Sequence, residues 1–230
     1  MPIHLEQVVP WGRSFDEYVR MFGLGDSDLD RVIFDCAGGP ASFNCEMRRR
    51  GCRVVSADPI YRFSAAQLAQ RFGETRDTIL SKTAESRENF VWDEMQSISR
   101  LGEIRMQAMN LFLRDFPGGL AEGRYLTAEL PQLPFGDSTF DLALCSHFLF
   151  TYSDLLSLEF HVESIRELCR VAGEARIFPL VPHFADARSP HLPPLINHLT
   201  ADGYFCEIIR VPYEFQRGAN EMLRATRSVQ

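Results

Sequence analysis

The sequence predicts a doubly wound α/β fold, in which a mostly parallel sheet carries helices on both faces. Three observations predict this class. The stretch 32–58 reads as an apolar strand, a Gly-Gly turn, a helix and a second apolar strand. Further short apolar runs alternate with helical patterns up to residue 181, as expected of buried parallel strands. A chain of 230 residues that is 45% hydrophobic can bury one core, so we predict a single domain over 1–230.

The turn after the first predicted strand is the best candidate for a ligand site. Gly38 and Gly39 permit a tight turn, Pro40 suits the first turn of a helix, and Gly51 ends that helix. Ligands of open α/β sheets bind at the carboxyl ends of the strands, where glycine lets the backbone come close. Asp58 ends the second strand roughly twenty residues beyond the glycines, which is the spacing of a ribose-binding acid.

The connection from the second strand to the next one, near Tyr125, is unusually long. A crossover between parallel strands needs only about a dozen residues. Ser64 and Ser86 are the predicted N-caps of helices in this connection, and the stretch 117–119, Pro-Gly-Gly, is the predicted stop. We therefore predict a helical insertion over 62–120 that forms a cap or an interface.

The other elements follow from local patterns. Ser14 and Glu17 form a capping box for a helix before the first strand, within an N-terminal helical cap over 1–30. The remaining predicted elements are a strand that begins at Asp141 and ends at 145–148, a long helix capped by Ser153-Asp154 and carrying Leu155, a strand over 175–181, and a C-terminal β-hairpin over 200–230.

Composition excludes several classes of protein. A formal net charge of -7 argues against a broad electrostatic grip on nucleic acid. No stretch is apolar for long enough to span a bilayer, and the first residues lack the pattern of a signal peptide. The six cysteines show neither a Cys-x-x-Cys pair nor zinc spacing, which favours a reducing cytosol. We predict a cytoplasmic protein with no nucleic-acid partner and no membrane span, and the sequence leaves its oligomeric state open.

Two groups of residues contain side chains that bind metals. The loop after residue 181 carries His183, Asp186 and His191, which have the chemistry to bind a metal or a substrate, although a proline-braced surface loop is the simpler interpretation. His161 and Glu163 are two positions apart on a predicted helix and so do not share a face. We predict no metal site.

An acid, Asp35, immediately precedes the glycine turn. A dinucleotide fold carries Gly-x-Gly-x-x-Gly with free amides for a pyrophosphate, which an acid at this place would repel. At these residues the chain resembles the class I S-adenosylmethionine (SAM) dependent methyltransferases, whose first motif is an acid followed by Gly-x-Gly-x-Gly. Their second strand ends in an acid, as it does here at Asp58. The resemblance implies a SAM site made by Asp35, Ala37, Gly38, Gly39, Asp58 and Pro59.

The block 125–147 is also similar to this family. It contains an acid, then Leu-Pro-Phe, a small polar turn, Phe-Asp and an apolar strand. The resemblance implies that Glu129 accepts from the adenine amine and that the amide of Leu130 reaches the ring. It also places Ser146 and His147 at the edge of the cofactor. His147 is a candidate general base, because imidazole titrates near neutral pH, and a purely positional contact is the alternative.

The resemblance also implies features of the fold, and the sequence departs from the family motif at two positions. It implies a seven-stranded sheet whose last strand is antiparallel, and an N-terminal helix over the cofactor, so that Arg13 could meet a cofactor carboxylate or an acidic substrate. A solvated arginine is the alternative. Ala37 and Ala41 replace the first and third glycines of the family motif. A positive φ at Ala37 would strain the turn.

The function that the sequence predicts is methyl transfer from SAM to a small-molecule acceptor, by in-line attack of the acceptor on the methyl group. Proximity and desolvation would supply most of the rate, so an obligatory catalytic residue is not required. Two alternatives remain open. One is a methyltransferase-fold protein without activity that serves in protein interaction or cofactor sensing, and the other is an NAD(P)-dependent oxidoreductase.

Overall fold

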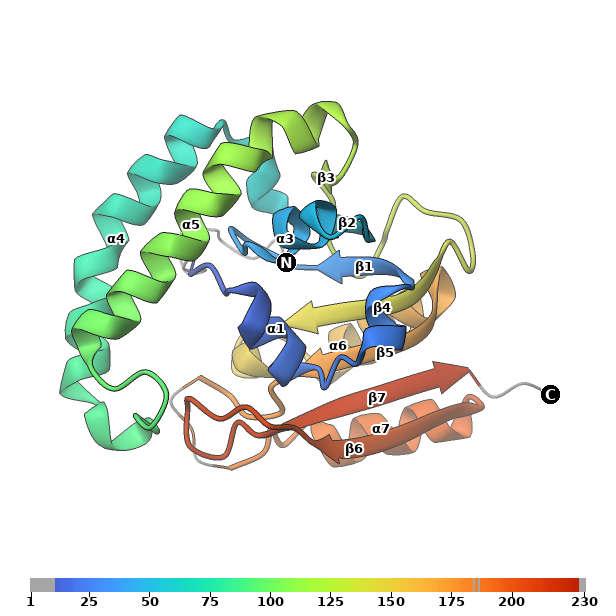
Figure 1. Ribbon diagram of the computed structural model, residues 1–230. Coiled ribbons are helices and arrows are strands. Elements are labelled where there is room, and N and C mark those ends of the chain that lie inside the picture. Colours follow the sequence, from blue (N-terminus) through green and yellow to red (C-terminus); the bar gives the residue numbers. More distant parts are fainter. Residues whose placement is uncertain (1–10, 184, 186, 228–230) are drawn as a thin grey trace.

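The structure is a computed structural model that describes residues 11–183, 185 and 187–227. A seven-stranded sheet lies at its centre, with helices on both faces (Figure 1). The strands are β1 Val32–Cys36, β2 Arg53–Ala57, β3 Tyr125–Leu126, β4 Phe140–Ser146, β5 Ala172–Phe178, β6 Tyr204–Arg210 and β7 Glu221–Arg227. The α-helices are α1 Phe15–Met21, α2 Asp26–Leu29, α3 Phe43–Arg49, α4 Ala65–Glu85, α5 Ile98–Ala121, α6 Leu158–Val171 and α7 Leu192–Ala201. Short 3-10 helices are η1 Pro59–Arg62, η2 Arg87–Asn89 and η3 Phe150–Tyr152.

The strand order is β3-β2-β1-β4-β5-β7-β6. All neighbouring strands are parallel except β7, which runs antiparallel to both β5 and β6. This arrangement confirms the predicted fold class, including the reversed last strand. Strands β1 to β3 follow one another toward one edge of the sheet, and the strands from β4 onward extend toward the other edge. The strand order therefore reverses between β1 and β4. In open α/β sheets a ligand binds in the crevice at this position, at the carboxyl ends of the strands.

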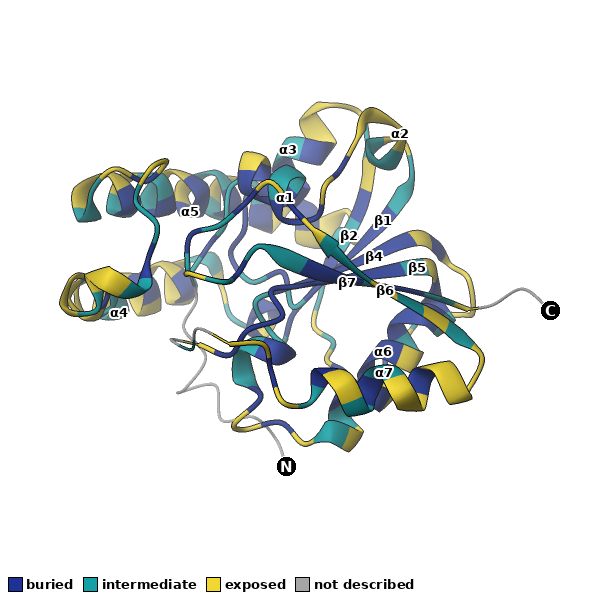
Figure 2. Ribbon diagram, turned by 90° about the horizontal axis from the view of Figure 1, so that it is seen from below, coloured by how far each residue is buried: buried dark blue, intermediate teal, exposed yellow. Residues whose placement is uncertain are grey.

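Burial on both faces explains why the central strands are mostly apolar. Ile33 of β1 packs with α1 and α3 residues such as Tyr18 and Phe43, whereas Phe34 packs on the opposite face with α6 and α7 residues such as Ile165. Figure 2 shows the strands as the most buried part of the molecule, between helices whose outer sides are exposed. The sheet is therefore a rigid support for the loops at its carboxyl edge.

The long insertion forms a pair of helices, α4 and α5, and the carboxyl ends of β1 and β4 point toward them (Figure 1). The segment between these helices is fastened to the connection between β6 and β7. The amide of Val91 donates to the carbonyl of Phe215 at 2.7 Å, and the amide of Arg217 donates to the carbonyl of Asn89 at 2.9 Å. The rings of Phe90 and Phe215 stack at 4.8 Å. Residues far apart in sequence thus close over the same edge of the sheet.

Two predicted helix boundaries in the insertion are wrong. Ser86 is the C-cap of α4 and starts only a 3-10 turn, while Ser97 caps the second long helix by accepting from the amide of Arg100 at 3.1 Å. The Pro-Gly-Gly stretch 117–119 does not end α5, which continues to Ala121. A Cβ at Gly119 would lie 2.4 Å from the ring of Tyr125, so this glycine lets the tyrosine pack against the helix.

Two other helices begin later than predicted. Helix α6 is capped by Ser157, which accepts from the amide of Phe160 at 3.1 Å, and not by Ser153-Asp154. Ser153 donates instead to the carbonyl of Phe150 at 2.8 Å, and Leu155 is 57% exposed because it precedes the helix. Helix α3 begins three residues after Pro40. The capping box of Ser14 and the left-handed Gly51 after α3 are confirmed.

Candidate functional site

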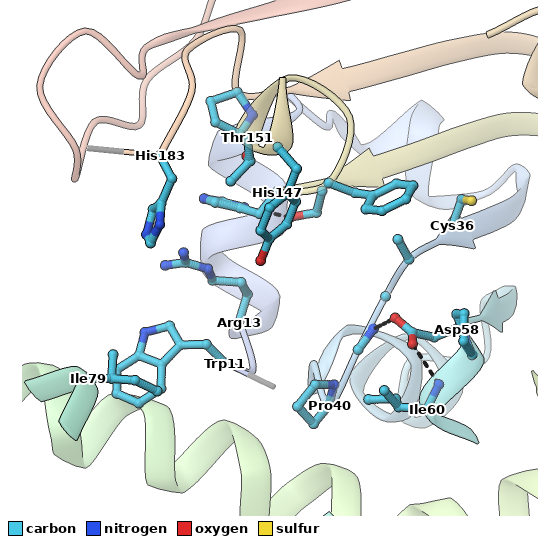
Figure 3. Close-up of a pocket in the computed structure, with 18 of the residues that line it drawn as sticks. Trp11, Arg13, Cys36, Pro40, Asp58, Ile60, Ile79, His147, Thr151 and His183 are labelled. Atoms are coloured by element: carbon cyan, nitrogen blue, oxygen red, sulfur yellow. Dashed lines mark hydrogen bonds between the residues drawn. The ribbon is translucent and has the colours of Figure 1, made fainter. Parts of the chain in front are cut away.

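A cavity of about 1170 Å³ lies at the carboxyl edge of the sheet. Cys36, Asp58, Ser146 and Pro179, which end or follow four different strands, all line it. Figure 3 shows side chains from these strand ends and from the N-terminal segment converging on this space. Pockets that hold one drug-sized ligand measure roughly 300 to 1,000 Å³. The cavity therefore has room for a cofactor and a second small molecule.

The structure brings together nearly all residues that the sequence singled out. The predicted site residues that line the cavity are Ala37, Gly38, Gly39, Asp58, Pro59, Glu129, Leu130, Ser146 and His147. Arg13 and His183 line it as well. Asp35 does not, because its side chain is buried beneath the turn.

Asp58 holds the glycine turn in place. Its Oδ2 accepts from the amide of Gly39 at 2.9 Å, and its Oδ1 accepts from the amide of Ile60 at 2.9 Å, which caps η1. The hydroxyl of Tyr61 donates to the carbonyl of Gly39 at 2.8 Å. Burial raises the pKa of Asp58 to about 6, against the lowering effect of the two backbone hydrogen bonds. Each carboxylate oxygen keeps a second lone pair, so Asp58 can also accept from ligand hydroxyl groups in the cavity.

Asp35 supports the same turn from beneath. It is 1% exposed, and its two oxygens accept from the hydroxyls of Tyr18 at 3.0 Å and Ser56 at 2.8 Å. A Cβ at Gly38 would lie 2.2 Å from Oδ2 of Asp35, so only glycine fits above the carboxylate. Burial raises the pKa of Asp35 to about 7, and the hydrogen bonds from Ser56 and Tyr18 offset only part of this effect. The geometry gives Asp35 a positioning role in place of the predicted direct contact with the cofactor.

Ala37 stands where the family motif has a glycine, and its backbone has a positive φ of 54°. This conformation is strained for alanine. The left-handed conformation costs a residue with a Cβ about 1 to 2 kcal/mol, whereas glycine adopts it freely at some cost in unfolded-state entropy. We expect Ala37→Gly to raise the free energy of unfolding by about 0.5 to 1 kcal/mol in urea denaturation.

Ala41 provides the matched control for this prediction. It is also a replaced motif glycine, but it is buried at 4% exposure and is not among the residues with positive φ. Ala41→Gly should therefore destabilise the protein, by about 0.5 to 1 kcal/mol. Equal effects of the two substitutions would contradict the proposed strain at Ala37.

His147 follows β4 with a φ of 51°, and its amide donates to the carbonyl of Phe178 at 2.7 Å. Its Nδ1 lies 2.9 Å from the hydroxyl oxygen of Ser146. Burial and the nearby charge of Arg13 hold the pKa of His147 well below its usual value. The imidazole is consequently neutral at neutral pH and a weaker base than an ordinary histidine, and its Nε2 is an acceptor in the tautomer whose Nδ1–H donates to Ser146.

Glu129 and Leu130 follow β3 and line the cavity. The side chain of Glu129 is exposed, whereas Leu130 is buried. Ala128 and Pro131, the residues on either side of this pair, also line the cavity. A solvated carboxylate at the rim can accept a hydrogen bond from a ligand amine without a large desolvation cost.

A buried ionic network that sequence reasoning missed borders the same cavity. Glu17 was assigned only to a capping box, yet its carboxylate pairs with both terminal nitrogens of Arg105, one of them at 2.7 Å. The hydroxyl of Tyr213 donates to Glu17 at 2.8 Å. One signal existed in the sequence: Arg105 falls on the apolar stripe of α5 between Leu101 and Phe112. An arginine on a buried stripe indicates a buried acid as its partner.

In the described part of the loop after β5, the candidate metal ligand His191 makes structural contacts. The Nε2 of His191 lies 3.1 Å from the carbonyls of Ser153 and Leu156, so this side chain ties the loop to η3 and the residues after it. Asp186 lies outside the described residues. Among residues 11–183, 185 and 187–227, no group of three histidine, cysteine or acidic side chains is placed to hold a metal ion. In the same part of the chain, no helix is both long and apolar enough to cross a membrane.

The strand order, with β7 reversed between β5 and β6, is that of the class I methyltransferase fold. The glycine turn after β1 and the acid at the end of β2 occupy the expected places in this fold. The fold therefore agrees with the one that the sequence resemblance implies.

Comparison with known proteins places the chain in a family. It is 30% identical over 223 residues to the uncharacterized protein MJ0045 of Methanocaldococcus jannaschii, covering 96% of this chain and 97% of that protein. The chain belongs to the same family as that protein. No family model matches the chain.

Solved structures with the same general arrangement include several methyltransferases. The chain is similar to magnesium protoporphyrin IX methyltransferase (ChlM) from Synechocystis PCC 6803 with bound SAM, with 15% identity, a TM-score of 0.45, and coverage of 93% of this chain and 91% of that one. It is also similar to a SAM-dependent methyltransferase from Methanosarcina mazei, with 12% identity, a TM-score of 0.46, and coverage of 88% and 94%. A third, from Aquifex aeolicus, has 14% identity, a TM-score of 0.43, and coverage of 92% and 88%.

Proposed function

We propose that this protein is a SAM-dependent methyltransferase that acts on a small molecule. The observation that carries the proposal is the fixed relation between Asp58 and the glycine turn. The amide of Gly39 donates to Asp58, so this acid and the glycine backbone lie side by side in the lining of one cavity. A ligand can approach both. A nucleoside with hydroxyl donors fits this arrangement, because the acid accepts from the hydroxyls while the glycines leave room for the ligand.

The residues present fit the cofactor along its length. Asp58 would hold the ribose, Glu129 and the backbone of Leu130 the adenine, and the turn from Ala37 to Gly39 the amino-acid portion. SAM supplies an activated methyl group on a sulfonium, which an acceptor nucleophile attacks in line. The protein contributes position and exclusion of water, through the apolar side chains of Phe90, Leu101 and Phe215 that line the cavity. In the tautomer whose Nδ1–H donates to Ser146, Nε2 of neutral His147 can accept a hydrogen bond from the acceptor, but its lowered pKa makes it a weak base.

The geometry disfavours a dinucleotide reductase. Pyrophosphate binding requires free amides at the glycine turn, but the amide of Gly39 donates to Asp58. Two buried acids, Asp35 and Asp58, lie against the same turn, and negative charge at that place repels a pyrophosphate. The carboxylates suit instead a ligand with hydroxyl groups and positive charge.

The test is calorimetric titration with S-adenosylhomocysteine (SAH), with NAD as the control ligand. We expect micromolar binding of SAH and no response to NAD. Glu129→Ala should weaken SAH binding by about tenfold or more, because a charge-assisted hydrogen bond to the adenine amine is lost. Asp58→Ala should weaken it further, since it also releases the turn. The matched control is Glu163→Ala, an exposed acid on α6 that does not line the cavity.

Turnover separates the enzyme from a protein that only senses the cofactor. Incubation with SAM and candidate acceptors should release SAH at a rate that depends on the acceptor. If the folded protein binds neither SAH nor NAD, the proposal fails and the interaction alternative takes its place. Binding of SAH without release in any acceptor screen would favour a sensing role.

A further inference from the structure

We infer that the end of the cavity beneath the helical insertion is an acceptor subsite for a flat, apolar molecule that carries an acidic group, which Arg13 holds. The inference rests on the proposed function and deepens it, because it names the class of the methyl acceptor. Three observations carry it: an uncompensated positive charge, unpartnered buried polar atoms, and an aromatic wall.

The positive charge is that of Arg13, and it is uncompensated because of how Arg105 and Glu17 pair. Nη1 of Arg13 lies 3.6 Å from Oε1 of Glu17. That carboxylate, however, is bound by both terminal nitrogens of Arg105, is 2% exposed at its side chain, and so is already neutralised. Two arginines thus face one acid, so Arg13 keeps an uncompensated positive charge in a cavity whose lining also includes the cations Arg62, Arg71 and Lys82. The two nearby histidines do not add to it, because burial and Arg13 lower the pKa of both His147 and His183.

Polar atoms without partners lie at the same end. Nη1 of Arg13 is buried and has no hydrogen-bond partner among the described residues, and the same is true of the Thr151 hydroxyl. Both residues line the cavity. A buried guanidinium nitrogen or hydroxyl without a partner is costly, so such groups are found where a ligand completes them. A carboxylate has the charge and the acceptor atoms to bind both.

The position of Arg13 separates this site from the nucleoside site. Figure 3 shows the guanidinium of Arg13 pointing toward His183, with His147 and Thr151 on the same side of the cavity. Asp58 lies at the other end, where it contacts the glycine turn. The amide of His183 donates to the carbonyl of Thr151 at 3.0 Å, which ties the loops after β4 and β5 into one wall. The proposed anion site therefore lies beside the loops after β4 and β5, at the opposite end of the cavity from Asp58.

Apolar side chains, most of them aromatic, line this end beside polar side chains of α4 such as Glu74, Thr78 and Lys82. Trp11, Ile79, Phe90, Leu101 and Phe215 line the cavity there, from the N-terminal segment, α4, α5 and the connection between β6 and β7. The stacked rings of Phe90 and Phe215 fix part of this wall. Flat hydrophobic ligands pack well against such faces. The cavity volume of about 1170 Å³ leaves space for such a molecule beside a cofactor.

The test uses two pairs of probes with matched shape, 1-naphthoate with 1-naphthamide and benzoate with benzamide. Each is titrated into the SAH-saturated protein. We expect at least one acid to bind about tenfold or more tightly than its amide, as a charged hydrogen bond to Arg13 predicts. Arg13→Gln should remove this preference, and Arg13→Lys should retain part of it, because lysine keeps the charge but not the planar fork. The matched control Arg20→Gln, on helix α1 outside the cavity, should keep the full preference.

Titration of SAH and of 5′-methylthioadenosine, which lacks the amino-acid portion, distinguishes the two possible anions. The inference requires that Arg13→Gln leave the affinity for both unchanged. If Arg13→Gln weakens SAH but not 5′-methylthioadenosine, then Arg13 holds the carboxylate of the cofactor and the inference is overturned. It is equally overturned if the wild-type protein binds no acid in preference to its amide. Failure of SAH itself to bind would count against the proposed function, while acid preference can still be measured without SAH.

Discussion

Replacing Arg105 by methionine is expected to lower the free energy of unfolding by about 3 to 5 kcal/mol. Arg105 is fully buried, and both of its terminal nitrogens bind the carboxylate of Glu17, which is 1% exposed. Burial alone would raise the pKa of Glu17, but the charge and hydrogen bonds of Arg105 outweigh it and hold that pKa far below its usual range. Without Arg105, a buried carboxylate keeps only the weaker approach of Arg13 and the hydrogen bonds from Ser14 and Tyr213.

Urea denaturation at pH 7 measures this loss, and two variants show its origin. Arg100→Met on the same helix removes an exposed ion pair with Glu103, at 2.9 Å, and should cost less than about 1 kcal/mol. Glu17→Met combined with Arg105→Met removes the buried pair and should recover part of the stability, because no buried carboxylate is left without Arg105, while Arg13 loses its neighbour Glu17. A loss for Arg105→Met no larger than that for Arg100→Met would refute the assignment.

The same network explains how the cavity is assembled. Glu17 is on α1, Arg105 is on α5, and Tyr213 lies between β6 and β7, so one buried carboxylate joins three elements around the site. These partners are 88 and 196 residues apart in sequence. Local patterns carry no information on such pairs. The capping box between Ser14 and Glu17 could be predicted because its atoms are three residues apart, whereas the second role of Glu17 depends on the fold.

The fold class and the position of the site could be predicted for a physical reason. Buried parallel strands are mostly apolar, and the carboxyl ends of such strands meet at one edge, so residues after each strand converge without knowledge of tertiary contacts. This reasoning points to Gly39 and Asp58, whereas the resemblance to methyltransferases adds Ala37, Ser146 and His147, and all of them line the cavity. Asp35 differs because its side chain points beneath the turn, a direction that depends on the packing of Tyr18 and Ser56.

Two of the helix boundaries that were wrong share a cause. A Pro-Gly-Gly sequence usually ends a helix, but packing of Tyr125 against Gly119 makes the continued helix favourable. Ser153 has the composition of an N-cap, yet its hydroxyl lies 2.6 Å from that of Ser189 on the loop after β5. In both places a contact with a distant residue outweighs the local preference. Such contacts cannot be seen in a window of sequence.

The second large expected effect concerns pH and Asp35. Its pKa is about 7 in the folded protein, against an ordinary value of 3.8. The folded state therefore binds more protons than the unfolded state between these values, and stability falls as pH rises through this window. The contribution of this group should fall by roughly 4 kcal/mol between pH 4 and pH 8. It should become constant only at about one pH unit or more below 3.8, where the carboxyl is protonated in both states.

Asp35→Asn isolates this contribution, since an amide of the same shape does not titrate. The groups that face Asp35 are the hydroxyls of Tyr18 from α1 and Ser56 from β2, together with the carboxylate of Asp58 beyond the turn. Asp58, whose own pKa is raised to about 6, titrates in both proteins, so its direct effect largely cancels in the comparison. The variant should gain stability relative to the wild-type protein as pH rises from 4 to 8, measured by urea denaturation at each pH. A difference that stays constant with pH would mean that Asp35 is ionised throughout, and that the hydroxyls beneath the turn stabilise its charge more than burial opposes it.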